Sequence, residues 1–396
     1  MDRKKKRLFK KGIAITLIVC FSIGVAVSAW AIGIVAGSKV KILEYEQWQE
    51  NHLEELRPRL LWNYAQRDFS GYCDFDLNQA YLDGVKYNDV QFLATHNSYK
   101  DKPGPLMYAF ELLNYSNYGY YFDPLYDQLD KGIFSLELDV YPTETGFLCM
   151  HKTYGDIATT GYNMALALEE IAIWSSCNVG HLPITIMIEP KGWVLKNKDA
   201  MNMTDPGVME RFDELLLDTF GDKLYTPADM LGDTYDNLSE AAAADAWPTL
   251  LEMKDKIMVF EITDRVYQYI DLDPSMKTQK MFPAMKMLLA DKYEGYEIHR
   301  AVTWIDETFE MDKQELLKAE KKGTAKYDVS ELFQQALAEN LFIRTRIDMY
   351  EYYSETAVPL VIAAGGNVLA TDYPPHNNDR TDYVIPLDKT VFLKSN

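Results

Sequence analysis

Short apolar segments with strand character recur along this 396-residue chain, and longer stretches with helical character separate them. The strand candidates are Val90–Thr95, Ile133–Val140, Ile184–Glu189, Ile257–Thr263, Phe342–Arg346 and Asn367–Thr371. The helical candidates include Tyr162–Ser175, Val208–Thr219, Lys313–Lys321 and Val329–Ala338. Alternating strands and helices predict an α/β fold with a parallel sheet. A (β/α)₈ barrel normally takes about 250 residues, which leaves room for insertions, the largest at residues 193–250.

Polar side chains cluster where the predicted strands end. His96, Asp139, Glu189, Arg346 and Asp372 lie at, or directly after, the carboxyl ends of five different strands. In a closed barrel these ends converge on one face, where the site is built. An open sheet gathers residues from so many strands less easily, so the pattern favours a TIM-type barrel.

Acidic residues and one amide form a candidate site for a hard cation. Glu137 and Asp139 alternate with apolar residues, so a strand puts both carboxylates on one face. A strand edge facing water would give the same alternation, but Glu189 also ends an otherwise apolar strand. With Asn97, these residues supply four oxygen ligands of the kind that Ca²⁺ takes. Mg²⁺ fits this open set less naturally, because it demands a strict octahedron.

Two histidines accompany these carboxylates. His96 follows the first strand, and His151 follows the strand that carries the paired acids. Two such histidines can exchange protons across one bond-breaking event, and with a cation site they indicate metal-assisted phosphodiester chemistry. The remaining histidines have no strand-end carboxylates near them in the sequence and are interpreted as structural: His52, His181, His299 and His376.

Basic side chains near the strand ends are candidates for phosphate recognition, because guanidinium groups match phosphate oxygens. Arg344 and Arg346 share one strand face. Arg344 is interpreted as a structural partner of a carboxylate, and Arg346 as a substrate-binding residue. Lys191 could meet an anionic headgroup or could be a solvated loop residue.

The N-terminal region differs sharply from the rest of the chain. Residues 1–12 are rich in lysine and arginine, and Ile13–Ala36 contains no charged residue. An apolar run of this length can cross a bilayer, and the basic flank predicts a cytoplasmic N-terminus with the body outside the cytoplasm. A signal peptide cleaved after Ala31, giving a secreted protein, is the alternative. Residues 37–71 are predicted to be a helical stalk or a linker, and residues 72–396 a single barrel domain.

Composition and missing motifs exclude several functions. A net charge of −20 is a poor match to nucleic acid, which binds clustered Lys and Arg. The chain contains no Gly-x-Ser-x-Gly elbow, Walker loop or Gly-x-Gly-x-x-Gly fingerprint, so those routes to serine hydrolysis and nucleotide binding lack support. The four cysteines do not suggest a disulfide-built scaffold, and no sequence feature indicates a protein partner.

The order of these segments resembles a known family, phosphoinositide-specific phospholipase C. Four segments of this chain resemble the part of that family called the X region: Thr95–Tyr99, Glu137–Asp139, His151 and Ile188–Glu189. Two later segments resemble the bacterial calcium-dependent branch of the family: Arg344–Asp348 and Ala364–Tyr373. Together the segments extend over residues 90–375.

The resemblance implies a (β/α)₈-type barrel that binds Ca²⁺ and cleaves an inositol-type phospholipid by attack of the 2-hydroxyl on phosphorus. It implies His96 and His151 as acid–base residues. It implies a ligand set of Asn97, Glu137, Asp139 and Glu189. Candidate substrate-binding residues are Lys191, Arg346, Asp372 and Tyr373.

One departure from the family concerns a later strand. Eukaryotic members end it in lysines that hold extra ring phosphates, whereas this chain has Phe260-Glu261-Ile262-Thr263. An unphosphorylated inositol lipid or a glycosylated relative is therefore the expected substrate. Two other interpretations stay open: a glycerophosphodiesterase-like barrel enzyme, although its usual His-Arg opening is absent, and a catalytically silent surface-binding module.

Overall fold

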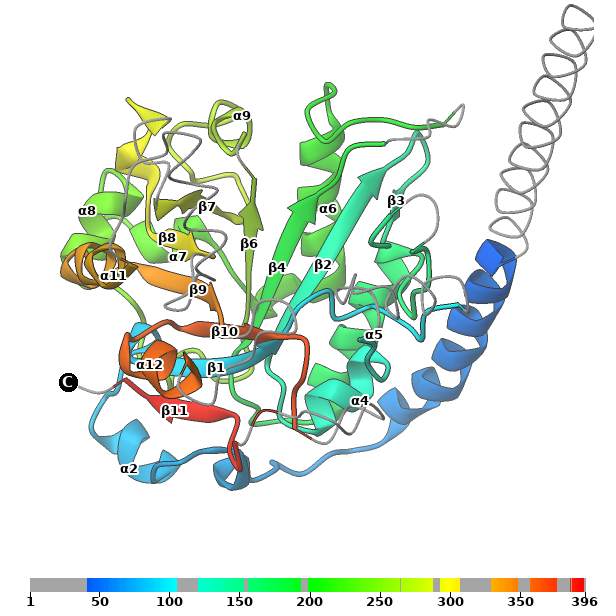
Figure 1. Cartoon of the computed structure of the whole chain (residues 1–396), viewed down its shortest axis with the longest axis horizontal. Coiled ribbons are helices and arrows are strands. Elements are labelled where there is room, and N and C mark those ends of the chain that lie inside the picture. Colours follow the sequence, from blue (N-terminus) through cyan, green and yellow to red (C-terminus); the bar gives the residue numbers. More distant parts are fainter. Residues whose placement is uncertain are drawn as a thin grey trace, which may run out of the picture.

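Eight parallel strands close into a barrel in the computed structural model (Figure 1). The structure describes residues 41–104, 120–152, 156–193, 199–263, 265–287, 293–306, 329–347, 357–375, 385 and 387–394. The barrel strands are β1 (Val90–Thr95), β2 (Ser135–Pro142), β4 (Ile184–Pro190), β6 (Ile257–Ile262), β7 (Phe282–Lys286), β8 (Val302–Ile305), β9 (Phe342–Arg346) and β10 (Val368–Thr371).

Each barrel strand pairs in parallel with the next one along the chain, and β10 closes the ring by pairing with β1. At the closure, Phe92 lies beside Val368 and Thr95 beside Thr371. Three short strands flank the barrel: β3 (Phe147–Leu148), β5 (Leu224–Tyr225) and β11 (Val391–Leu393). The predicted parallel barrel is confirmed.

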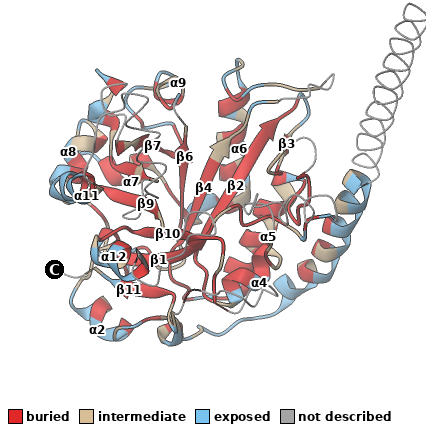
Figure 2. Ribbon diagram, in the orientation of Figure 1, coloured by how far each residue is buried: buried red, intermediate tan, exposed pale blue. Residues whose placement is uncertain are grey.

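Helices lie around the barrel, and the strands are buried between them and the barrel interior (Figure 2). The α-helices with defined bounds are α2 (Leu77–Leu82), α4 (Leu125–Asp130), α5 (Met164–Cys177), α6 (Val208–Phe220), α7 (Pro227–Leu231), α8 (Leu238–Ala243), α9 (Tyr267–Ile270), α11 (Val329–Ala338) and α12 (Ala357–Ala363). Single 3₁₀ turns are η1 (Arg57–Leu61), η2 (Ser70–Tyr72), η3 (Tyr87–Asp89), η5 (Gly221–Lys223) and η7 (Glu297–His299).

Most predicted elements agree with the structure, and two of the barrel strands were missed, as were the three short flanking strands. The limits predicted for Val90–Thr95 and Phe342–Arg346 match β1 and β9. The missed barrel strands are β7 and β8, which are short, and β7 contains Pro283, a residue that argues against a strand interior. The predicted helix Lys313–Lys321 lies outside the described residues, and the predicted insertion holds α6, α7, α8 and β5.

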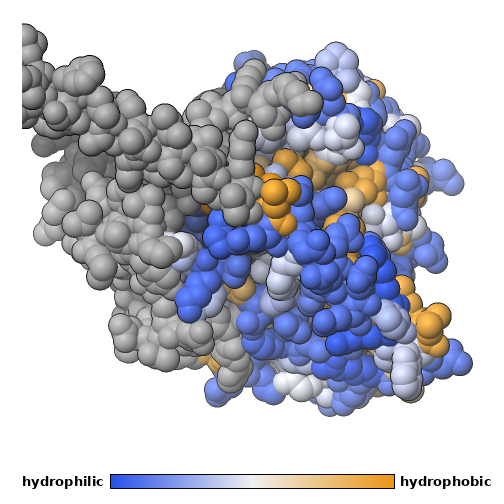
Figure 3. All heavy atoms as spheres, turned by 90° about the vertical axis from the view of Figure 1, so that its right-hand side faces the viewer, coloured by the Kyte–Doolittle hydropathy of each residue, from blue (hydrophilic) through white to orange (hydrophobic). Residues whose placement is uncertain are grey.

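Hydrophilic side chains cover most of the described surface on the face shown in Figure 3, and hydrophobic ones gather in a small area. The described cysteines, Cys73, Cys149 and Cys177, are buried and free. Among the described residues, we find no helix with the length and apolar character needed to cross a membrane. The predicted anchor, Ile13–Ala36, lies outside the described residues.

Residues 41–56 form a helix that packs along α5. The Gln49 side chain makes two hydrogen bonds with the backbone of Asn163, of 3.0 and 2.8 Å. Directly after the helix, Arg57 forms a bidentate ion pair with Glu169, at 2.7 and 2.9 Å. Leu53 is fully buried in the hydrophobic core. This helix is therefore an integral part of the domain.

Leu53→Ala is expected to lower the free energy of unfolding by about 2–5 kcal/mol, because it leaves a cavity where this helix meets the core. Urea denaturation measures the change. Leu43, in the same helix, is 65% exposed, so Leu43→Ala is the matched control and should change stability by no more than about 0.5 kcal/mol. Equal effects of the two substitutions would show that the helix does not pack on the barrel in solution.

Candidate active site

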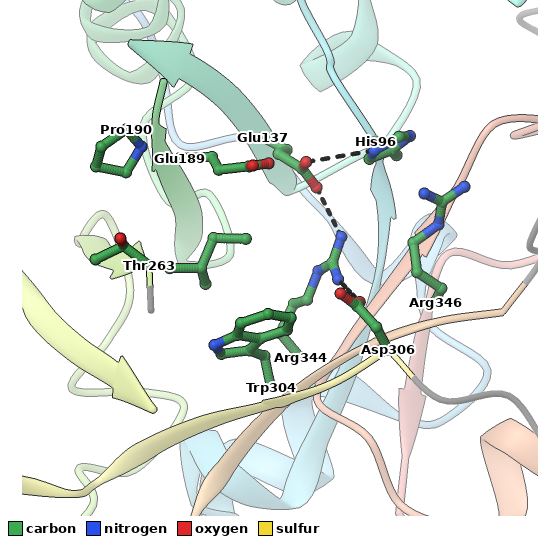
Figure 4. Close-up of a pocket in the computed structure, with 10 residues that line it drawn as sticks. His96, Glu137, Glu189, Pro190, Thr263, Trp304, Asp306, Arg344 and Arg346 are labelled. Atoms are coloured by element: carbon green, nitrogen blue, oxygen red, sulfur yellow. Dashed lines mark hydrogen bonds and ion pairs between the residues drawn. The ribbon is translucent and has the colours of Figure 1, made fainter. Parts of the chain in front are cut away.

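A pocket of about 440 Å³ opens at the carboxyl ends of the barrel strands (Figure 4). Its walls come from β1, β2, β4, β6, β8 and β9, or from the residues that directly follow them. The lining residues are His96, Glu137, Glu189, Pro190, Ile262, Thr263, Trp304, Asp306, Arg344 and Arg346. Of the polar side chains predicted at strand ends, His96, Glu189 and Arg346 thus meet in this cavity.

His96 is held at the pocket wall by a carboxylate. It follows β1, and its Nδ1 lies 2.7 Å from Oδ1 of Asp372, directly after the adjacent strand β10. The other oxygen of Asp372 accepts a 2.9 Å hydrogen bond from Arg346. Burial, with Arg346 adding to it, lowers the pKa of His96 to about 3, so the imidazole is neutral. Burial alone would raise the pKa of Asp372, but Arg346 and His96 lower it to about 2.

The geometry of this pair fixes the state of the imidazole. Because ionised Asp372 can only accept, Nδ1 carries the proton and Nε2 is the acceptor nitrogen of the ring. Nε2 lies 3.6 Å from Oε1 of Glu137. An imidazole in this tautomer can take a proton from a group bound in the pocket.

Three carboxylates lie together beside His96. Glu137, Asp139 and Glu189 each offer an oxygen within 4.8 Å of the other two. The β2–β4 register pairs Asp139 with Glu189, which brings both to the same face of the sheet. Burial raises the pKa of Glu137 to about 7 and also raises that of Asp139. Both carboxylate oxygens of Asp139 are buried without a hydrogen-bond partner.

Two cations partly balance this acidic cluster. Arg344 donates a 2.8 Å hydrogen bond to Glu137 and also pairs with Asp306. Lys191 pairs with Glu189, and its Nζ lies 3.4 Å from Asp139. The expected carboxylate partner of Arg344 is thus present in the barrel core, yet Arg344 also lines the pocket. Lys191 contacts the carboxylates rather than open solvent.

Asn97 follows His96 and is held by hydrogen bonds to two tyrosines. It has a left-handed backbone (φ 55°), a conformation that asparagine tolerates better than most residues. Its Oδ1 accepts a 3.1 Å hydrogen bond from the Tyr99 hydroxyl, and its amide nitrogen donates to Tyr120 at 2.6 Å. The amide nitrogen also lies 3.3 Å from Nε2 of His96. In this arrangement Asn97 orients its neighbours.

His151 is tied to a buried ion pair that the sequence analysis missed. Its Nδ1 lies 2.6 Å from Oδ2 of Asp156, and the same oxygen accepts a 2.9 Å hydrogen bond from Lys100. The Lys100 ammonium lies 4.2 Å from the ring centre of Tyr120, whose hydroxyl is 3.2 Å from His96. Burial lowers the pKa of His151. The two histidines are therefore linked through Tyr120, Lys100 and Asp156, although His151 does not line the 440 Å³ pocket.

The other predicted substrate-binding residues occupy different places. Arg346 lines the pocket, whereas Asp372 does not line it and instead contacts the His96 ring. The Tyr373 backbone N–H donates to the Thr371 hydroxyl, and Tyr373 does not line the pocket. Trp304, in β8, and Asp306, directly after β8, also line the pocket. The sequence analysis missed both residues because it missed β8.

Comparison with known proteins matches this chain to one family. The family model described as "Phosphoinositide phospholipase C, Ca²⁺-dependent" matches residues 85–151 and 142–287. A calcium-dependent phosphoinositol-specific phospholipase C from a Gram-negative Pseudomonas species has a similar fold, with TM-score 0.56 and 16% identity over 82% of this chain and 99% of that one. A Ca²⁺-dependent phosphatidylinositol-specific phospholipase C from Streptomyces antibioticus gives TM-score 0.51 and 17% identity over 79% and 100%. A search of curated protein sequences gave no match.

Proposed function

The chain belongs to the calcium-dependent phosphoinositide phospholipase C family, and we propose that it cleaves an inositol phospholipid into diacylglycerol and a cyclic inositol phosphate. Family membership makes it a phosphodiesterase of the phospholipase C type that depends on Ca²⁺. The observation that carries the finer proposal is that His96, which pairs with Asp372, lines one pocket with Glu137 and Glu189 of the acidic cluster and with two arginines.

The acidic cluster fits a calcium ion. Glu137, Asp139 and Glu189 would hold it together with the Asn97 side-chain oxygen, since hard cations take carboxylate and amide oxygens. The buried oxygens of Asp139 are the strongest sign: they lack a hydrogen-bond partner, and the Lys191 ammonium, 3.4 Å away, is shared with Glu189, so an ion there would balance a charge that is costly to bury. When bound, the ion would lower the pKa of the attacking hydroxyl and offset negative charge developing on the phosphate.

His96 is the proposed base. Its neutral ring presents Nε2, which takes the proton of the inositol 2-hydroxyl as that oxygen attacks phosphorus. Asp372 holds the ring in the required tautomer and stabilises the imidazolium that forms. Arg344 and Arg346 line the same cavity, where guanidinium groups can donate hydrogen bonds to phosphate oxygens.

His151 is the proposed acid that protonates the leaving glycerol oxygen. Its ring is oriented by the hydrogen bond to Asp156, which also favours the protonated form. Lys100 shares this carboxylate and keeps it ionised. The support for this role is the position of His151 in the family motif together with this oriented ring.

The His151 role predicts a dependence on the leaving group. His151→Ala should lower kcat/KM on the lipid by about 10²–10⁴-fold, as expected for loss of an acid–base residue. With a p-nitrophenyl inositol phosphate the loss should be about tenfold or less, because this leaving group departs without protonation. Steady-state kinetics on both substrates measure the ratio. Equal losses on the two substrates would contradict an acid role, and His96→Ala, which should lose equally on both, is the matched comparison.

We also propose that residues 13–36 anchor the enzyme in a membrane, with the barrel outside the cytoplasm. The support is the uncharged run Ile13–Ala36 and the place where the first described helix begins. Ile42 and Tyr45 pack against a cluster that contains Tyr141, at the carboxyl end of β2. The first described helix therefore begins on the side of the barrel where the pocket opens, and a lipid substrate would lie on that side.

This anchor predicts that the full-length protein stays with the membrane after alkaline carbonate extraction. Its barrel should be cleaved by protease added to the outside of intact cells, because the positive flank keeps residues 1–12 in the cytoplasm. A soluble product whose N-terminus follows Ala31 would show instead that the segment is a cleaved signal peptide.

A further inference from the structure

His151 lies between two segments of the chain that are hydrogen-bonded to each other. Before it, β3 pairs with the carboxyl end of β2, and Leu148 lies opposite Tyr141. After it, the carbonyl of Tyr162 accepts a 2.8 Å hydrogen bond from the backbone N–H of Cys149. The backbone position of His151 is therefore set by the elements that hold these two segments in place.

One such element is the helix of residues 41–56, drawn in blue in Figure 1. Its fully buried Gln49 side chain bonds both backbone groups of Asn163, directly after Tyr162. One turn earlier, the helix contributes to a small hydrophobic cluster at the mouth of the barrel. This mouth cluster consists of Tyr141, Met150 and Tyr162, against which Ile42, Tyr45, Leu148 and Trp193 pack.

Tyr141 connects the mouth cluster directly to His151. Its side chain is buried, and the centre of its ring lies 5.2 Å from that of Trp193. Its hydroxyl donates a 3.1 Å hydrogen bond to the backbone carbonyl of His151. Because packing holds the Tyr141 ring, this bond fixes the peptide of His151 and the direction in which the imidazole leaves the backbone.

Tyr45 lies near the carboxylate that orients the same imidazole. Burial raises the pKa of Tyr45 to about 12, and the charges of Asp101, Glu44 and Asp156 add to this effect. Asp156 is the residue whose Oδ2 lies 2.6 Å from Nδ1 of His151. The beginning of the helix therefore packs beside both contacts of His151, the one to its backbone and the one to its ring.

We propose that the helix of residues 41–56 positions His151 through the mouth cluster, with Tyr45 and Tyr141 as positioning residues. The inference rests on the proposed function, in which His151 protonates the leaving oxygen. A shift of about 1 Å in a catalytic group can cost about 10²-fold in rate, so correct seating of this helix is needed for that step. The helix that follows the proposed anchor thus takes part in the reaction without touching the substrate.

The test is a ratio of two kcat values of the full-length protein with calcium. One substrate is phosphatidylinositol, whose leaving oxygen needs a proton, and the other is a p-nitrophenyl inositol phosphate, whose leaving group does not. Tyr141→Phe keeps the ring and removes the hydroxyl, so it should lower the lipid-to-nitrophenyl ratio by about 3–10-fold, the effect of one hydrogen bond. KM for the lipid should stay unchanged.

The helix side of the contact is tested in the same assay. Tyr45→Ala should lower the ratio by a similar factor, and Tyr45→Phe, which keeps the packing ring, should retain the wild-type ratio. Leu43→Ala is the matched control, because Leu43 belongs to the same helix and is exposed, and it should also retain the ratio.

Two outcomes would overturn the inference while the proposed function stands. Equal losses on the two substrates would show that the mouth cluster only supports the fold. An unchanged ratio in Tyr141→Phe or in Tyr45→Ala would show that the residue does not act on His151.

If the wild type cleaves neither substrate, the proposed function fails, and a chemical probe decides the positioning instead. The probe is the rate at which diethyl pyrocarbonate modifies His151, measured by mass spectrometry. A rate raised about threefold or more in Tyr141→Phe and Tyr45→Ala, but not in Leu43→Ala, supports the inference. Rates equal to that of the wild type overturn it.

Discussion

His96→Ala is expected to lower kcat/KM on an inositol phospholipid by about 10²–10⁴-fold, because it removes the proposed base from the pocket. Asp372→Asn should give a loss of similar order, since an amide can donate to Nδ1 and so favour the wrong tautomer of His96. The loss should fall on kcat more than on KM, because the imidazole acts on the reacting proton rather than on the lipid. Steady-state kinetics with lipid vesicles measure both parameters.

The control for this prediction is a histidine outside the pocket. His52 lies 3.2 Å from Glu170, where the N-terminal helix meets α5, and His52→Gln keeps a hydrogen-bonding group there. Its activity should stay near that of the wild type. Retention of most activity by a folded His96→Ala protein would contradict the proposed base and move that role to a carboxylate.

Asp139→Asn should abolish calcium-dependent activity while making the calcium-free protein more stable. Without the ion, the wild type holds the fully buried Asp139 carboxyl within 4.8 Å of Glu137 and Glu189, and a neutral amide of the same shape costs less to bury beside two acids. With the ion, binding stabilises the wild type by about 2.7 kcal/mol at a calcium concentration 100 times the dissociation constant. The variant should lose this gain.

Thermal unfolding in chelator and in excess calcium measures both effects. The expected pattern is a crossover: the variant unfolds at a higher temperature than the wild type in chelator, and at a lower one in calcium. Asp218→Asn removes the same charge from an exposed position on α6 and should show no crossover. A calcium shift retained in Asp139→Asn would exclude this carboxylate as a ligand.

The strand-end pattern allowed much of the site to be predicted from sequence. In a parallel barrel the carboxyl ends of all strands meet at one mouth, so His96, Glu189 and Arg346 could be assigned to one pocket without knowing any contact. The alternation of Glu137 and Asp139 likewise put both on one strand face. These inferences rest on the alternation of side chains along one strand, which can be read from the sequence of that strand alone.

What sequence could not reveal was pairing between distant segments. Lys100, from the loop after β1, is buried against the Asp156 carboxylate that also contacts His151. Arg344 looked structural, and it does pair with carboxylates, but its neighbours Glu137 and Asp306 also place it in the pocket wall. Asp306 itself was hidden because the short strand before it, Val302–Ile305, has too few residues to show a period.

The most direct test of the central claim is product analysis with the full-length protein on phosphatidylinositol vesicles, in calcium and then in chelator. The account predicts calcium-dependent release of diacylglycerol together with a cyclic inositol phosphate, identified by its phosphorus NMR signal. Loss of both products in chelator should be reversed by adding calcium back. Release of a free alcohol without diacylglycerol would indicate a glycerophosphodiesterase, and calcium binding with no cleavage of any phosphodiester would indicate a binding module; either result would contradict the account.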